Sequence, residues 1–144
     1  MTLLDANILL YAYNPGSPEH ASCSRWLENA LSGREPVGLA WAVILAFARL
    51  ATNPRLFRAP LTIDEACAAI QGWLSQPLLQ ILEPTDRHWA ILSGLLVSSQ
   101  VRGTLVMDAD LAALAIEHGA TLVTTDRDFT RFNGLKLLNP LAPR

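Results

Sequence analysis

Short apolar segments that alternate with helical-period segments predict an α/β domain with a mainly parallel central sheet and helices on both faces. Three observations support this fold class. The apolar segments are short, helical patterns separate them, and turn residues such as Asn, Pro and Gly mark the boundaries. The chain of 144 residues has the length of one domain, and no repeat or linker divides residues 1–144.

Five of these segments are predicted to be strands because they are short, apolar and bounded by turns or helical patterns. In chain order they are residues 3–4, 37–39, 79–82, 121–124 and 135–138. The last of them is predicted to be a short edge strand.

Helical periodicity predicts six helices between the strands. In chain order they cover residues 8–13, 18–31, 41–52, 62–74, 85–99 and 108–118. Turn chemistry ends the first helix at Asn14-Pro15-Gly16 and the third at Asn53-Pro54, and Gly119 ends the last. Thr62 and Glu65 have the spacing of a capping box at the start of the fourth helix. The third helix is apolar almost all round, which predicts burial on most of its faces.

The composition is apolar for a small domain. Hydrophobic residues make up 51% of the chain and charged residues 17%, and the mean hydropathy is +0.25. This surplus predicts a well-buried sheet and an apolar face covered by a second copy of the chain. No segment is long enough to span a bilayer, and the N-terminus has no secretory pattern, so we expect a cytoplasmic protein. Cys23 and Cys67 lie far apart and are expected to be reduced thiols.

Acidic residues follow several of the predicted strands. Asp5 directly follows the first strand, and Asp126 and Asp128 follow the fourth. Asp108 follows three apolar residues and is predicted to be the N-cap of the last helix. Because ligands bind beyond the carboxyl ends of the strands in open α/β sheets, we expect these carboxylates to meet at one end of the sheet.

A divalent cation would resolve the repulsion between these acids. Mg²⁺ prefers oxygen ligands and keeps several waters, so two or three carboxylates are sufficient to hold it. The remaining positions suit phosphate oxygens and a nucleophilic water, as phosphodiester hydrolysis requires. The chain has no Cys/His cluster for zinc, no P-loop and no paired-glycine fingerprint. His20, His88 and His118 make no recognisable dyad.

Simpler structural roles remain open for several of these residues. Asp108 is also explained as an ordinary N-cap, and Asp126 and Asp128 as solvated loop or first-turn acids. Asn7 is either a turn residue or a partner that fixes Asp5. Asp110 is also explained as an ordinary acid on the helix surface.

Three segments stand out by their order and spacing: residues 3–9 (LLDANIL), 108–115 (DADLAALA) and 124–129 (TTDRDF). They resemble the characteristic blocks of PIN domains, and most of all those of the VapC toxins of bacterial toxin–antitoxin pairs. Residues 46–54 (AFARLATNP) also resemble the helix-end motif of one VapC subgroup. The resemblance covers nearly the whole chain, from residue 2 to about residue 138.

This resemblance implies a PIN-like three-layer α/β/α fold, Mg²⁺ or Mn²⁺ at the acidic pocket and RNA endonuclease activity. It also implies a homodimer and neutralisation by a VapB-type antitoxin. Asp5 and Asp108 match the principal metal ligands of the family, and Asp126 matches the fourth acid of its quartet. These three are the expected catalytic residues, and Asp128 is an additional metal ligand.

Further residues are expected to support this site. Thr124 or Thr125 matches the hydroxyl residue often found beside the fourth acid, and we assign supporting roles to Thr125, Asn7 and Asp110. In one respect the chain departs from the family pattern. The family glutamate falls near Ile44, but no acid occurs from residue 36 to residue 63. Asp110 or Asp128 is the candidate for the missing charge, and a second metal or full activity is in question.

The net charge of −2, with ten arginines and the single lysine Lys136, is not typical of a nucleic-acid-binding protein. RNA contact is therefore expected to be local. The candidates are Arg49, Arg55 and Arg58, which cluster in sequence near the end of the third helix, and Arg127, which lies inside the acidic block.

Two alternative functions are left open. A phosphatase of the haloacid-dehalogenase type also places an aspartate after the first strand, but it needs an acid two residues later, where this chain has Asn7, and usually a lysine. The second alternative is a PIN fold that has lost catalysis and serves as a binding module, which the missing glutamate motivates.

Overall fold

Five strands pair side by side in one sheet, and every neighbouring pair is parallel. The computed structural model describes residues 1–142, so the last two residues of the predicted domain lie outside the described part. The strands are β1 (Thr2–Leu4), β2 (Val37–Leu39), β3 (Leu79–Ile81), β4 (Thr121–Val123) and β5 (Lys136–Leu138). Their order is β3-β2-β1-β4-β5, so β5 forms one edge as predicted.

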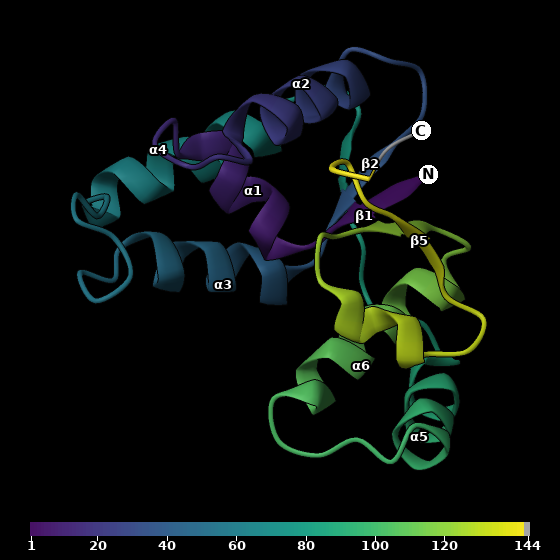
Figure 1. The fold of residues 1–144 in the computed structure, drawn as a ribbon. Coiled ribbons are helices and arrows are strands. Elements are labelled where there is room, and N and C mark those ends of the chain that lie inside the picture. Colours follow the sequence, from purple (N-terminus) through teal and green to yellow (C-terminus); the bar gives the residue numbers. More distant parts are fainter. Residues whose placement is uncertain (143–144) are drawn as a thin grey trace.

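Six α-helices and one short 3₁₀ helix connect these strands. They are α1 (Ala6–Tyr13), α2 (His20–Leu31), α3 (Trp41–Ala51), α4 (Ile63–Leu74), α5 (His88–Ser98), α6 (Leu105–Glu117) and the 3₁₀ helix η1 (Arg127–Arg131). The path from β1 through β2 to β3 moves across the sheet in one direction, and the step from β3 to β4 returns past β1. Because parallel crossovers are right-handed, the two directions put their helices on opposite faces of the sheet. Figure 1 shows α1 to α4 gathered on one side and α5 and α6 on the other. The predicted α/β fold is confirmed as an α/β/α arrangement with an all-parallel sheet.

The core is built on the central strands. Leu3, Leu4 and Leu122 have no exposed surface, and Phe47 of α3 is equally buried. The prediction that α3 is buried on most faces is wrong for its outer face, where Leu45 is 66% exposed. None of the helices among residues 1–142 is long and apolar enough to cross a membrane.

Several predicted boundaries shift by a few residues. The capping box of α4 is confirmed, because the Thr62 hydroxyl accepts from the Glu65 amide at 3.1 Å and the Glu65 carboxylate accepts from the Thr62 amide at 3.0 Å. Helix α5 begins at His88 rather than three residues earlier. Helix α6 begins at Leu105 rather than at Asp108, because Gly103 turns the chain with a φ of +65° and the three apolar residues before Asp108 already form helix. It ends, as predicted, before Gly119, whose φ is also +65°.

The strand order fixes where a ligand is expected to bind. Strand β1 has β2 on one side and β4 on the other, so the chain reverses direction across the sheet between β1 and β4. Such a topological switch point opens a crevice beyond the carboxyl ends of the strands. The Asp5 amide still donates to the Val123 carbonyl at 3.0 Å, so Asp5 lies at this crevice.

Candidate functional site

A cleft of about 810 Å³ opens at this end of the sheet. Asp5 and Asn7 line it from the start of α1, Asp108 from the start of α6, and Asp126 from the segment after β4. Along its α3 side the lining is apolar except for Arg49. Acids from three separate parts of the chain therefore share one cleft.

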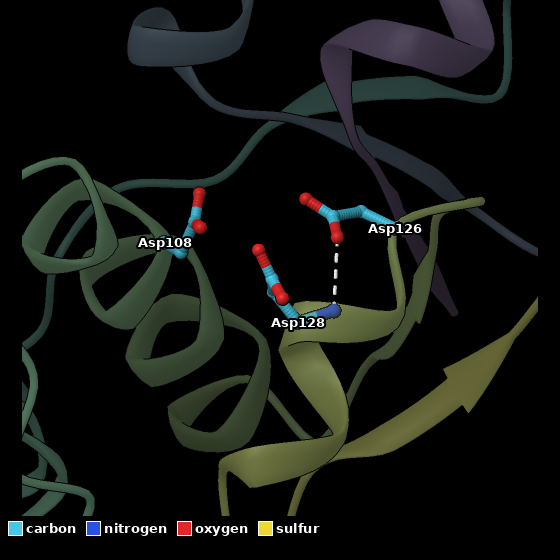
Figure 2. A group of neighbouring side chains, drawn as sticks. All are labelled: Asp108, Asp126 and Asp128. Atoms are coloured by element: carbon cyan, nitrogen blue, oxygen red, sulfur yellow. Dashed lines mark hydrogen bonds between the residues drawn. The ribbon is translucent and has the colours of Figure 1, made fainter.

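The tightest group in this region consists of Asp108, Asp126 and Asp128. One carboxylate oxygen from each lies within 4.8 Å of the other two. Figure 2 shows these carboxyl groups facing the space between α6 and η1, with the Asp128 amide donating to the Asp126 carboxylate at 2.9 Å. The structure thus brings three of the four predicted metal ligands together. Asp108 does so from the first turn of α6, so its predicted position as an N-cap is wrong.

Asp5 is held beside this group by two hydrogen bonds. Its Oδ1 accepts from the Ala6 amide at 2.7 Å, which makes it the N-cap of α1, and its Oδ2 accepts from the Thr124 hydroxyl at 2.7 Å. Both bonds fix the carboxylate toward the cleft. The negative charge of Asp5 contributes to the raised pKa of Asp108, so Asp5 interacts electrostatically with the cluster.

The hydroxyl group that organises the site belongs to Thr124, not to Thr125. Thr124 is only 3% exposed; besides donating to Asp5, its hydroxyl oxygen accepts from the Asp126 amide at 3.0 Å and from the Asn7 amide nitrogen at 3.4 Å. The supporting role assigned to Thr125 is therefore corrected. Asn7 is a partner in this network rather than only a turn residue, and its buried Oδ1 has no hydrogen-bond partner.

Burial and the repulsion between neighbouring carboxylates raise the pKa values of two acids in the site. Burial, followed by the charges of Asp126, Asp5 and Asp128, raises the pKa of Asp108 from 3.8 to about 6, against the opposing charge of Arg131. Burial also raises the pKa of Asp5, although its bonds from Thr124 and Ala6 act against this. A group of acids in this condition gains from a neutralising cation.

The donor set fits a hard divalent cation. Three carboxylates within reach of one another, a fourth at their edge and an unpartnered amide oxygen are all oxygen ligands of the kind that Mg²⁺ and Mn²⁺ bind. Neither cysteine lies in the cleft lining or in the cluster. The arrangement can hold a cation and place a phosphate beside it.

Helix α3 adds no acid to the site. Ile44, near which the resemblance places the family glutamate, is 4% exposed and belongs to the core. The α3 residues that line the cleft are Ala42, Val43, Leu45, Ala46, Arg49 and Leu50. The gap in the acidic set that the sequence predicted is therefore present in the structure.

Of the predicted RNA-contacting arginines, only Arg49 lines the cleft. Arg127 is exposed on η1, between Asp126 and Asp128 in the chain. Arg55 and Arg58 are exposed on the segment between α3 and α4 and are not part of the cleft lining.

Asp110 does not join the acidic group. Its carboxylate lies 2.7 Å from Nε2 of His88, whose Nδ1 lies 3.0 Å from the Glu117 carboxylate. The prediction that no histidine takes part in a close pair is thus wrong for His88. Arg131, which contacts Asp128, is a second residue that the sequence pattern did not single out.

Lys136 lies exposed on β5, two strands away from β1. Asn7 is bonded to Thr124 where a haloacid-dehalogenase-type phosphatase needs an acid. Neither residue supports that chemistry.

The model of the PIN domain family matches residues 2–135. Ribonuclease VapC37 of Mycobacterium tuberculosis is 46% identical over 142 residues, which is 99% of both chains. Ribonuclease VapC33 of the same species is 38% identical over 141 residues, covering 98% of this chain and 99% of the relative. Among solved structures, VapBC2 from Rickettsia felis bound to a promoter DNA fragment contains a chain similar in fold, with a TM-score of 0.72 and 21% identity over 96% of this chain and 97% of that chain.

Proposed function

Because the chain belongs to the PIN-domain family, we propose that it is a cytoplasmic, divalent-metal-dependent endoribonuclease and the toxin of a toxin–antitoxin pair. Relatives called ribonucleases that match nearly the full length support the activity. The single observation that carries the metal-dependent chemistry is the group of Asp108, Asp126 and Asp128 at the switch point, with Asp5 beside it.

In this proposal Asp108, Asp126 and Asp128, with Asp5, hold Mg²⁺ or Mn²⁺. When bound, the cation neutralises the scissile phosphate and lowers the pKa of a water that attacks it. Thr124 fixes the Asp5 carboxylate toward the cleft through the 2.7 Å bond, so the ligand is oriented before the cation arrives. Asn7 offers its unpartnered Oδ1 as an acceptor for a water proton.

The RNA lies along the cleft in this proposal. Arg49 is the positive group that lines it, and Arg127 is exposed next to the acids. Arg55 and Arg58 lie outside the lining and would meet the backbone farther from the cut. Salt series of RNA affinity for Arg49→Gln and for the Arg55→Gln/Arg58→Gln double variant rank these arginines, since removing one that binds a phosphate makes the salt slope shallower by about 0.7 to 1. An unchanged affinity and slope in the double variant would remove that pair from the mechanism.

The proposed function is tested by RNA cleavage with added Mg²⁺ or Mn²⁺ and by calorimetric Mn²⁺ binding. Loss of a residue that merely supports a metal ligand costs about 10- to 100-fold, so Asp108→Asn should lower the cleavage rate by more than about 100-fold. Asp64→Asn, exposed in the first turn of α4, is the matched control and should cleave normally. Cleavage that survives both a chelator and Asp108→Asn would contradict the proposal.

Two partners belong to the proposal. A VapB-type antitoxin would inhibit by placing a basic side chain in the acidic cleft. A homodimer would cover apolar groups such as Trp89 and Val97 of α5, which are both more than half exposed and lie outside the cleft lining. Light scattering should then give twice the chain mass of 15.7 kDa at micromolar concentration. If the protein is a monomer, only the antitoxin would be left to cover these apolar groups.

The second candidate is a PIN fold that binds RNA or its partner without cutting. The absence of any acid on the α3 side of the cleft favours it. Mn²⁺ and RNA binding without metal-dependent cleavage would identify this function in the experiment above.

A further inference from the structure

We propose that Arg131 is the residue that binds a phosphate of the RNA strand next to the metal site, and that it does so at the cost of weaker metal binding. The inference rests on the proposed function, because it names a substrate contact of the same site. Arg131 ends η1, five residues after Asp126, and was not among the arginines expected from the sequence.

The guanidinium is fixed at the edge of the acidic group. Its Nε donates to the backbone carbonyl of Asp128 at 3.1 Å. Its Nη2 lies 3.9 Å from Oδ1 of Asp128, which is an ion pair but not a hydrogen bond. Its positive charge also acts on Asp108, whose pKa it lowers against the surrounding acids. Arg131 is therefore anchored by one donor, lies against Asp128, and acts through its charge on Asp108.

This anchoring leaves the other N–H donors of the Arg131 guanidinium free. The Arg131 side chain is 37% exposed, so water, and equally a ligand, reaches it. A guanidinium has five N–H donors in a rigid plane that matches two oxygens of a phosphate. Arg131 uses one of them on the Asp128 carbonyl, and no other side chain among residues 1–142 holds the guanidinium closer than the 3.9 Å pair. A half-exposed fork with free donors beside a cation site is suited to a phosphate that approaches the metal.

Metal and RNA should respond to this charge with opposite signs. A positive charge beside Asp108 and Asp128 repels a cation, whereas the same charge attracts a phosphate. If Arg131 served only to neutralise Asp128, its removal would change metal affinity alone. The two readouts together separate a substrate contact from a structural ion pair.

The experiment compares the full-length wild type with Arg131→Gln, Arg131→Lys and the control Arg25→Gln, which is exposed on α2 outside the cleft lining. Mn²⁺ affinity is measured by calorimetry without RNA. Affinity for a labelled single-stranded oligoribonucleotide is measured by anisotropy across a salt series in Ca²⁺, a cation that takes the same oxygen ligands, with a gel to verify that the strand stays intact. Circular dichroism verifies that each variant is folded.

Arg131→Gln should bind Mn²⁺ about five-fold more tightly and RNA about ten-fold more weakly, with a salt slope shallower by about 0.7 to 1. Arg131→Lys should keep the wild-type Mn²⁺ affinity and recover part of the RNA affinity, because it keeps the charge but not the fork. Tighter Mn²⁺ binding with unchanged RNA affinity in Arg131→Gln would overturn the inference and leave the proposed function standing. A wild type that binds neither Mn²⁺ nor RNA would overturn both.

Discussion

At the start of α6, Asp108 faces the carboxylates of Asp126 and Asp128, whereas farther along the same helix Asp110 and Glu117 hold the ring of His88 between them. Asp108 forms no ion pair with any residue in the described part of the chain. In the second group, each carboxylate lies within 3.0 Å of a ring nitrogen. Helix α6 thus carries Asp108, which faces other acids from the segment after β4, and also Asp110 and Glu117, which face a histidine.

The paired group shows what stabilising acids look like in this fold. Glu117 has no exposed side-chain surface; its carboxylate also accepts from the Thr85 amide at 3.1 Å, and its carbonyl accepts from Arg87 at 2.7 Å. Burial lowers the pKa of His88, but the bonds to Asp110 and Glu117 outweigh this effect and raise it. Both ring nitrogens face carboxylates, so the protonated ring can donate to Asp110 and to Glu117 at once, which favours that form. These contacts hold the start of α5 against α6, whereas Asp108 in the first turn of α6 forms no such link among the described residues.

The largest effect on stability is expected at Glu117. Glu117→Gln leaves the His88 ring with only one carboxylate in a buried position. It should lower the free energy of unfolding by about 3 kcal/mol, toward the lower end of the range for breaking a buried pair because Asp110 remains. The measurement is urea denaturation of the metal-free protein at one fixed protein concentration.

Glu28→Gln, exposed on α2, is the control for this variant and should change the free energy by less than about 0.5 kcal/mol. If Glu117→Gln and Glu28→Gln lower the free energy of unfolding by the same amount, the buried pair does not stabilise the fold. The contrast between the two groups of acids then has no basis.

The pH dependence of stability separates the two groups. The pKa of Asp108 in the fold, about 6, lies above its usual 3.8, so its stabilisation by proton uptake is complete below about pH 3.8 and is lost as the pH rises through 6. The pKa of His88 is raised above 6.5, so its contribution is present below pH 6.5 and is lost as the pH rises through the higher folded value. Asp110 and Glu117 face this ring directly, and Arg87 and His118 contact Glu117.

The metal-free protein should therefore be more stable at pH 5 than at pH 8, and Asp5, whose pKa burial also raises, contributes in the same direction. Asp108→Asn should remove the part of the change between pH 4 and 6, and His88→Gln the part above pH 6.5. Thermal unfolding in a chelator across this range measures both. Stability that rises steadily from pH 5 to pH 8 would contradict the assignment. Stabilisation by added Mn²⁺ should grow as the pH rises through about 6, because protons compete with the cation for Asp108.

The sequence predicted the unpaired group better than the paired one, for a physical reason. Asp5 and Asp126 could be predicted to converge because parallel strands bring their carboxyl ends to one edge of the sheet. His88 lies 22 residues from Asp110 and 29 from Glu117, and no local spacing predicts which turn of α6 the start of α5 will meet. Arg131 was missed because the 3₁₀ helix η1, which brings it against Asp128, was not predicted.

The start of α6 was misplaced because residues 105–107 are apolar in the way that a strand is. Only the positive φ of Gly103 shows that the chain turns into helix before them. The fold class and the parallel sheet could thus be predicted from the pattern, whereas the strand order and the contacts between helices could not.

The smallest and most telling effect is expected from a matched pair on one helix. Asp108→Asn removes a charge that burial and three neighbouring acids penalise, so it should raise the free energy of unfolding of the metal-free protein by about 1 kcal/mol, less than the full pKa shift because water still reaches the group. Asp110→Asn, two residues later and of the same shape, removes a partner of His88 and should lower it by about 1 to 2 kcal/mol. Stabilisation by added Mn²⁺ should vanish in the first variant and persist in the second. If Asp108→Asn destabilises the protein as much as Asp110→Asn does, Asp108 is a structural acid after all, and the repulsion at the cleft is not a cost that the fold bears for binding a cation.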